Sequence, residues 1–207
     1  LVHLIRVELG LDVPVMSLVT DIEPPGTRAY LEARAEEWGI EVEIVEPEVS
    51  FMAWLLEHAA DLSVTSEITR GHTMLGGLWD EAIERWRQQA GYEGWYWGLR
   101  AEESKGRRGN FARRGAIYQA ADGTWRAQPI VRWSGRDVYA YCFARGIELP
   151  RLYQACRFHE NDPSRLRKAM WLPGSFSQDG EVMWLRTYYP SLYEILQDLF
   201  FDASLYT

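Results

Sequence analysis

The sequence predicts an α/β fold, with a doubly wound, mostly parallel sheet flanked by helices and a helical C-terminal extension. Residues 1–46 follow the order helix, strand, helix, strand, which is typical of such a sheet. Residues 13–19 form a continuous apolar run, as expected for a parallel strand covered on both faces. Residues 95–99 form another strand-like run, rich in aromatic side chains. A chain of 207 residues is long enough to bury a sizeable core.

The first half of the chain supplies the regular elements of this sheet. We expect a helix over residues 1–9 and a strand over 13–19. The Pro-Pro-Gly-Thr sequence at 24–27 starts a helix that runs to about Trp38, and Gly39 ends it. Residues 41–45 alternate between apolar and polar side chains, so they predict the next strand.

The second half contains turn and helix signals around a basic segment. Asp122-Gly123 predicts the turn of a β-hairpin, and Ser134 to Asp137 resembles a capping box that starts a helix. We expect loops over 63–77 and 100–114. Further helices are expected over residues 51–60, 78–89, 137–145, 163–170 and 190–200. The aromatic-rich tail over 184–206 is expected to belong to the core rather than to a subunit interface, with a homodimer as the alternative.

Composition excludes several classes of function. The net charge of −8 disfavours a protein that coats nucleic acid, and no apolar run is long enough to cross a membrane. Cys142 and Cys156 form no CxxC motif, and the four histidines form no HExxH motif, so no iron–sulfur cluster or structural metal site is expected. A reducing, cytoplasmic setting fits this cysteine usage.

The basic segment over 100–114 is the strongest chemical feature of the chain. It holds six basic residues and two acidic ones, within a protein whose net charge is −8. Arginine offers a planar fork of donors suited to phosphate or sulfate, and Gly98 lets the backbone approach a ligand closely. Glu102 and Glu103 are suited either to orienting these arginines or to helping hold Mg²⁺. A solvated loop is the structural alternative.

Three ordered blocks resemble the phosphoadenosine phosphosulfate (PAPS) reductase family of the PP-loop superfamily. The first is Gly98-Leu99-Arg100-Ala101-Glu102-Glu103-Ser104, continued by Lys105-Gly106-Arg107. The second runs from Pro129 through Trp133, Ser134 and Asp137 to Tyr141, and Ile147 to Tyr153 follows it. The third is Val19-Thr20-Asp21 with the helix behind it. The resemblance is closest to the broad group that includes phage proteins and enzymes of DNA phosphorothioation.

The resemblance implies an adenine nucleotide alpha hydrolase-like domain over 1–155 and a helical extension over 156–207 packed on it. It implies ATP or PAPS as the nucleotide, with catalytic roles for Arg100 and Glu103. The nucleotide- and phosphate-binding residues it implies are Asp21, Gly98, Leu99, Arg100, Glu102, Ser104, Lys105, Arg107, Arg108, Trp133 and Asp137. For Asp137, capping of its own helix is the alternative role, with Trp133 packed behind the site.

Two family elements are absent from this sequence. The Ser-Gly-Gly-Lys-Asp-Ser phosphate loop is expected just before a helix such as 1–9. It either precedes Leu1 in a longer protein or is lost, in which case ATP cleavage is not expected. The Glu-Cys-Gly-Leu-His element of dedicated reductases is absent, although Arg157 and His159 near Cys156 would lower the pKa of its thiol.

These observations leave three functions open. The first is adenylation of an acceptor with pyrophosphate release, in nucleotidyl or sulfur transfer. The second is true PAPS or adenosine phosphosulfate reduction. The third is a catalytically degenerate nucleotide-binding subunit, with protein partners in a sulfur-transfer, phage or DNA-modification assembly.

Overall fold

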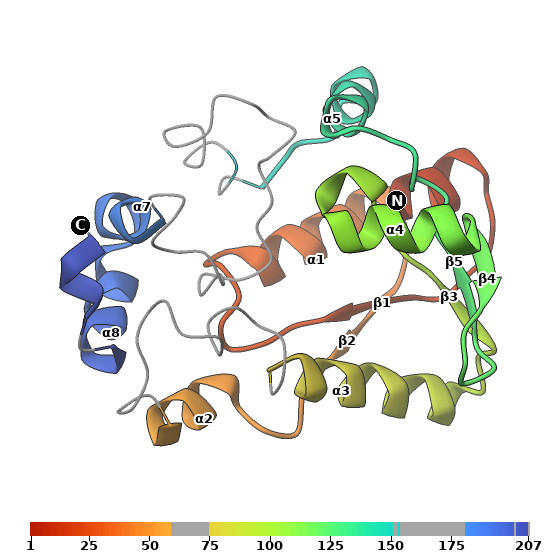
Figure 1. Ribbon diagram of the computed structural model, residues 1–207. Coiled ribbons are helices and arrows are strands. Elements are labelled where there is room, and N and C mark those ends of the chain that lie inside the picture. The colour runs from red at the N-terminus through yellow and green to blue at the C-terminus, as the bar shows by residue number, and fades with distance from the viewer. Residues whose placement is uncertain (59–74, 151–152, 154–180, 201, 207) are drawn as a thin grey trace.

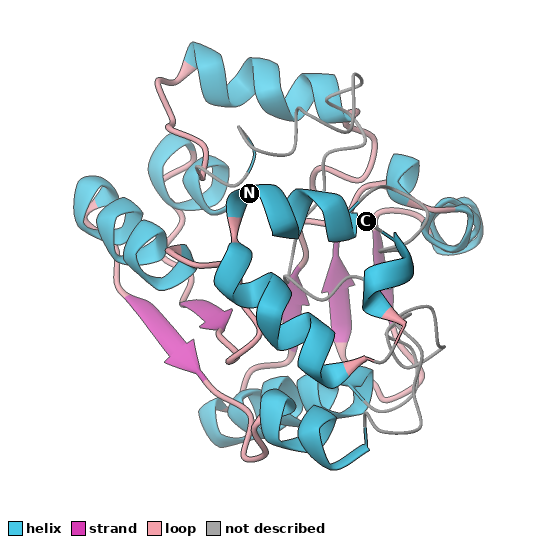
Figure 2. Ribbon diagram, turned by 90° about the vertical axis from the view of Figure 1, so that its left-hand side faces the viewer, coloured by secondary structure: helices cyan, strands magenta, loops and turns pink. Residues whose placement is uncertain are grey.

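The computed structural model describes residues 1–58, 75–150, 153, 181–200 and 202–206. Within them the predicted α/β class is confirmed, because helices lie above and below parallel strands (Figures 1 and 2). The described strands fall into two sheets, with the orders β1-β2 and β3-β5-β4.

The first sheet pairs β1 (Val15–Leu18) with β2 (Val42–Val45) in parallel, Val15 lying opposite Val42. Between these strands the chain forms α1 (Thr27–Trp38), which ends at Gly39 in a left-handed conformation with φ 61°. This confirms the predicted end, since glycine adopts that conformation without a Cβ penalty. Helices α1 and α3 (Leu75–Ala90) lie on opposite faces of the pair (Figure 1).

The second sheet contains β3 (Gly94–Tyr96), β5 (Trp125–Ala127) and β4 (Ile117–Gln119). Strand β3 is parallel to β5, whereas β4 is antiparallel to it. The predicted hairpin turn is confirmed, with Gly123 at φ 81° between β4 and β5. Gly94 is required by packing, because a Cβ there would lie 2.3 Å from the carbonyl oxygen of Trp125.

The two sheets share a hydrophobic core with α3. Val45, Ala82 and Trp86 are buried, and Met16, Leu18, Tyr92 and Trp95 pack against them. Trp86 stacks on Trp95 with 6.2 Å between ring centroids. The core therefore places β3, and the segment that follows it, beside the β1-β2 pair.

The predicted loop over 100–114 is wrong. The segment consists of a 3₁₀ turn, Ala101–Glu103, followed by α4 (Lys105–Arg114). The side chain of Ser104 caps α4, because its Oγ accepts a hydrogen bond from the backbone N–H of Arg107 at 3.1 Å. Arginine, lysine and alanine favour helix, whereas the two glycines and the lack of apolar periodicity hid this tendency.

Among the other helices, Glu181–Tyr188 and the 3₁₀ turn Ala203–Tyr206 were not predicted from the sequence, whereas the rest lie close to their expected positions. These other helices are the π-helical turn His3–Glu8, α2 (Phe51–His58), α5 (Gly135–Ala144), α7 (Glu181–Tyr188), α8 (Pro190–Leu199) and the 3₁₀ turn Ala203–Tyr206. Helices α7 and α8 pack together and bury Val182, Leu185, Leu196 and Leu199. No described helix is both long and apolar enough to cross a membrane.

Several expectations concern residues outside the described part of the chain. They are the helix over 163–170, most of the loop over 63–77, residues 59–60 of the predicted second helix, Cys156 and the boundary between 155 and 156.

Candidate functional site

Arg100 is a buried residue that holds the turn after β3 together. Its side chain is only 8% exposed, and its Nη1 lies 3.3 Å from Oε1 of Glu102. Its Nε lies 3.4 Å from Oε1 of Glu103, whose Oε2 accepts a hydrogen bond from the Arg100 backbone N–H at 3.0 Å. A buried guanidinium paired with two carboxylates is firmly positioned. In this structure Arg100 shapes the site rather than presenting a free cation.

Glu102 connects this turn with the start of α5. Its Oε1 accepts a hydrogen bond from the backbone N–H of Gly135 at 3.0 Å. Ser134 and Asp137 form the predicted capping box, with the Ser134 N–H donating to Asp137 Oδ2 at 2.7 Å. That hydrogen bond lowers the pKa of Asp137, and the Arg100 charge contributes. Two of the three resembling blocks are therefore in contact.

The first turn of α4 concentrates positive charge at the surface. Lys105, Arg107 and Arg108 are exposed, and Arg107 pairs with Glu103. Among the described residues, no carboxylate pairs with Lys105 or Arg108. The N-terminus of a helix also attracts anions, because its first N–H groups lack partners and the helix dipole is positive there. This turn is suited to a phosphate or sulfate group.

Asp21 follows β1 in the sequence, but its carboxylate forms hydrogen bonds with residues at the start of helix α2. Its carboxylate accepts hydrogen bonds from the backbone N–H groups of Phe51 at 3.1 Å and Met52 at 3.0 Å, and from the Ser50 hydroxyl. Asp21 therefore caps the start of α2. Contact between Asp21 and a nucleotide stays a prediction.

Gly98 and Trp133 occupy different surroundings. A Cβ at Gly98 would meet only the Leu1 side chain, at an ordinary distance of 3.7 Å, so packing does not require glycine there. Trp133 packs on Tyr141 of α5 with ring centroids 5.4 Å apart, and the Tyr141 hydroxyl lies 2.8 Å from His3 Nδ1. Trp133 thus supports α5 against the N-terminal helical turn.

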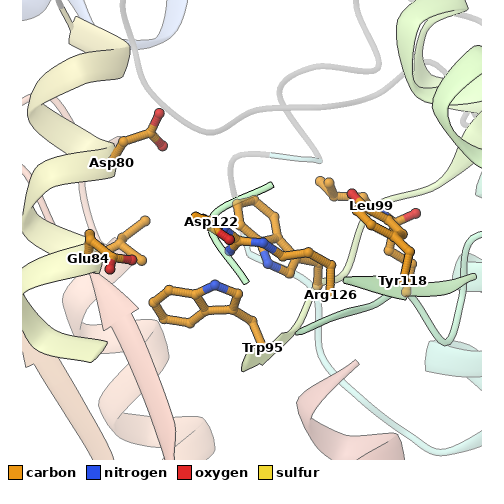
Figure 3. A pocket seen from close by; sticks show the side chains of 10 residues that line it. Asp80, Glu84, Trp95, Leu99, Tyr118, Asp122 and Arg126 are labelled. Carbon is orange, nitrogen blue, oxygen red and sulfur yellow. Dashed lines mark hydrogen bonds and ion pairs between the residues drawn. The ribbon is translucent and has the colours of Figure 1, made fainter. Parts of the chain in front are cut away.

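A cavity of about 530 Å³ lies between α3 and one face of the β3-β5-β4 sheet (Figure 3). Leu99 is the only one of the predicted site residues that lines it. The remaining lining residues were not predicted as site residues: Asp80, Ile83, Glu84, Trp95, Trp97, Tyr118, Asp122, Arg126 and Gln128. Their one sequence signal is the alternation of Trp95, Trp97 and Leu99, which places these side chains on one face of a strand.

Comparison with known proteins identifies the family of this chain. The model of the phosphoadenosine phosphosulfate reductase domain family matches residues 1–191. The chain belongs to this family. The match continues beyond residue 155, where we expect the C-terminal extension to begin. No curated protein matches the chain.

One solved structure similar to this chain is that of the phosphoadenylyl-sulfate (PAPS) reductase from Candida auris in a phosphate complex. The two share 17% sequence identity, with a TM-score of 0.47. The match covers 68% of this chain and 66% of that one, just under two thirds of the length of the Candida auris chain.

Within this family member, the described residues offer neither a metal site nor an activated thiol. No group of three His, Cys, Asp or Glu side chains that would hold a metal ion occurs among them. Glu102 and Glu103, the residues considered for Mg²⁺, are engaged with arginines and the Gly135 N–H. Burial raises the pKa of Cys142, which disfavours its thiolate form.

Proposed function

We propose that this chain binds an adenine nucleotide that carries a sulfate or phosphate group, PAPS or ATP, beside the first turn of α4. The observation that carries the proposal is the pairing of a helix N-terminus with exposed Lys105, Arg107 and Arg108, immediately after the braced Arg100 turn. Family membership supports a sulfonucleotide-related function.

In this proposal the residues divide into two roles. Arg107, Lys105 and Arg108 hold the anion, together with the free N–H groups of the first turn of α4. Arg100, Glu102 and Glu103 act as positioning residues, because their ion pairs fix the turn from which α4 begins. Asp137 fixes the neighbouring helix α5 through its capping box. The anionic oxygens thus meet donors that are already oriented.

The reaction we propose is nucleotidyl or sulfur transfer that starts from ATP: an acceptor oxygen attacks the α-phosphorus, the acceptor becomes adenylated and pyrophosphate leaves. Electrostatic stabilisation of the transferred group is the main requirement of such chemistry, and the α4 turn supplies it. The raised pKa of Cys142 disfavours reduction through that thiol. A nucleotide-binding subunit without catalysis is the second candidate, since the cations and the helix N-terminus at the start of α4 would serve binding alone equally well.

Calorimetric titration of PAPS, ATP and adenosine into the wild type and two arginine variants tests the binding proposal. Arg107→Ala removes an exposed cation at the start of α4, whereas Arg113→Ala removes an exposed cation at the end of the same helix. We expect Arg107→Ala to weaken the binding of PAPS and ATP about tenfold, because the variant loses one charge-assisted contact. Arg113→Ala should change the affinity by less than about threefold.

The adenosine arm separates anion recognition from base recognition. Adenosine lacks phosphate, so its affinity should be low and equal in the wild type and in both variants. Equal weakening of PAPS by the two arginine variants would indicate a general charge effect and contradict the proposed site.

A further inference from the structure

The cavity between α3 and the β3-β5-β4 sheet has two chemically different walls (Figure 3). The α3 wall presents the carboxylates of Asp80 and Glu84 on either side of Ile83. The sheet wall presents Trp95, Trp97 and Arg126. Trp95 and Arg126 lie opposite each other in the strand register, so their side chains share one face of the sheet.

The α3 wall is acidic, and its two carboxylates differ in their partners. Glu84 accepts hydrogen bonds from Arg87 Nε at 2.9 Å and from Gln88 Nε2 at 2.9 Å. Asp80 is exposed, and within the described part of the chain no cation pairs with it. Figure 3 shows the Asp80 side chain directed toward the space above Trp95. Asp80 is therefore the carboxylate of this wall that is available to a ligand.

The sheet wall holds an ion pair that lies over two tryptophan rings. Arg126 lies 2.9 Å from Asp122 and sits over the rings of Trp95 and Trp97, at 5.5 Å and 5.9 Å from their centroids. The indole Nε1 atoms of both tryptophans are buried and have no hydrogen-bond partner among the described residues. Because these two N–H groups are shielded from solvent, the guanidinium of Arg126 is the donor that this wall presents to the cavity.

The charge of the cavity separates it from the proposed anion site. Its lining holds three carboxylates, from Asp80, Glu84 and Asp122, against the single guanidinium of Arg126. Glu84 is paired with Arg87 and Asp122 with Arg126, so Asp80 is the carboxylate that repels a phosphate or sulfate group here. A cationic group would be attracted to Asp80 on the α3 wall, and a carboxylate oxygen would suit the guanidinium of Arg126 on the sheet wall.

We propose that this cavity is a second ligand site, which takes a small dipolar molecule of the amino acid class. Its ammonium group lies against Asp80, and its carboxylate lies against the guanidinium of Arg126, beside the rings of Trp95 and Trp97. The apolar part of the ligand packs between Ile83 and Leu99. Leu99, which lines the cavity, directly precedes Arg100 in the sequence. The cavity therefore adjoins the turn that leads to the proposed nucleotide site.

Calorimetric titration with three related probes tests this proposal. L-Phenylalanine carries both charged groups, 2-phenylethylamine carries only the ammonium, and 3-phenylpropionate carries only the carboxylate. We expect L-phenylalanine to bind most tightly and 3-phenylpropionate most weakly. Asp80→Asn should weaken the binding of L-phenylalanine about tenfold and leave the affinity for 3-phenylpropionate unchanged. Asp198→Asn, the same substitution at an exposed position of α8, should leave all three affinities unchanged.

A second measurement uses the wild-type protein alone. Addition of L-phenylalanine should shift the indole N–H resonances of Trp95 and Trp97, assigned with Trp95→Phe and Trp97→Phe, and leave the other indole resonances in place. Absence of binding up to about 10 mM would overturn the proposal, as would equal losses in Asp80→Asn and Asp198→Asn. PAPS affinity should be unchanged in Asp80→Asn, so failure here is distinguishable from failure of the nucleotide site.

Discussion

Oε1 of Glu102 accepts a hydrogen bond from the backbone N–H of Gly135 at 3.0 Å, and this bond joins two segments that are far apart in the sequence. The same carboxylate oxygen lies 3.3 Å from Nη1 of Arg100. One side chain therefore connects the turn before α4 to the first turn of α5. The positions of both helix N-termini depend on it.

Replacement of Glu102 by alanine should loosen this connection. Glu102→Ala leaves the Gly135 N–H and the Arg100 guanidinium short of a partner, so we expect the free energy of unfolding to fall by about 1–2 kcal/mol. Glu102→Gln keeps an oxygen acceptor for Gly135 and should recover part of this loss. Urea unfolding measures both variants. A Glu102→Ala variant that is as stable as the wild type would show that this hydrogen bond does not contribute to stability.

Ser104 allows helix capping and anion binding to be separated. Ser104→Ala removes the acceptor for the Arg107 N–H and should cost about 1 kcal/mol of stability. Ser104→Asn and Ser104→Asp both restore a capping oxygen, but only aspartate adds a negative charge beside the proposed anion. Thermal melts should show a stability close to that of the wild type in both variants. Calorimetry should show PAPS binding weakened about tenfold in Ser104→Asp alone. Unchanged PAPS affinity in Ser104→Asp would argue against an anion at this turn.

Gly94 and Gly98 lie on the same segment but differ in how closely other atoms pack against them. A Cβ at Gly94 would lie 2.3 Å from the Trp125 carbonyl oxygen, so Gly94→Ala should destabilise the protein by about 1–3 kcal/mol. A Cβ at Gly98 would meet the Leu1 side chain at 3.7 Å, so Gly98→Ala should change stability by less than about 0.5 kcal/mol. Chemical denaturation of both variants checks this contrast, and equal losses would contradict the described packing of β3 on β5.

Glu23 should make stability depend on pH. Burial raises the pKa of Glu23 to about 7, although a hydrogen bond from Thr20 acts in the opposite direction. The folded protein then keeps this proton while the unfolded chain loses it from about pH 4.5 upward. Stability from this group should therefore be full at low pH, fall as the pH rises toward 7, and stay level above that value.

Glu23→Gln removes the titrating group and tests this dependence. The variant should gain about 1 kcal/mol relative to the wild type above pH 7, once solvent screening of a half-buried group is allowed for, and nothing below pH 4. Melting temperatures across this pH range provide the measurement. A difference between the two proteins that is constant with pH would disprove the raised pKa.

Local signals predicted much of the fold because they depend on only a few neighbouring residues. Gly39 ends α1, Asp122-Gly123 forms the hairpin turn, and Ser134 with Asp137 starts α5, all as expected from backbone conformation and capping chemistry. Helix α4 was missed because its sequence is rich in basic residues and glycine and lacks an apolar stripe. Only the Ser104 cap marks its start.

The site was harder to predict because its contacts join distant segments. Nothing near Asp21 in the sequence indicates that its carboxylate caps α2, since Ser50, Phe51 and Met52 lie about thirty residues further along the chain. Glu102, which pairs with Arg100, likewise accepts its hydrogen bond from Gly135, about thirty residues further along the chain. The cavity depends on the packing of α3 on the second sheet, which the sequence does not specify.

The structure of the protein with bound PAPS tests the central claim most directly. We predict phosphate or sulfate oxygens within hydrogen-bond distance of the Arg107 guanidinium and the first N–H groups of α4, with the Arg100 ion pairs to Glu102 and Glu103 intact. PAPS bound in the cavity beside Asp80 and Trp97, or anywhere away from α4, would contradict the proposed function.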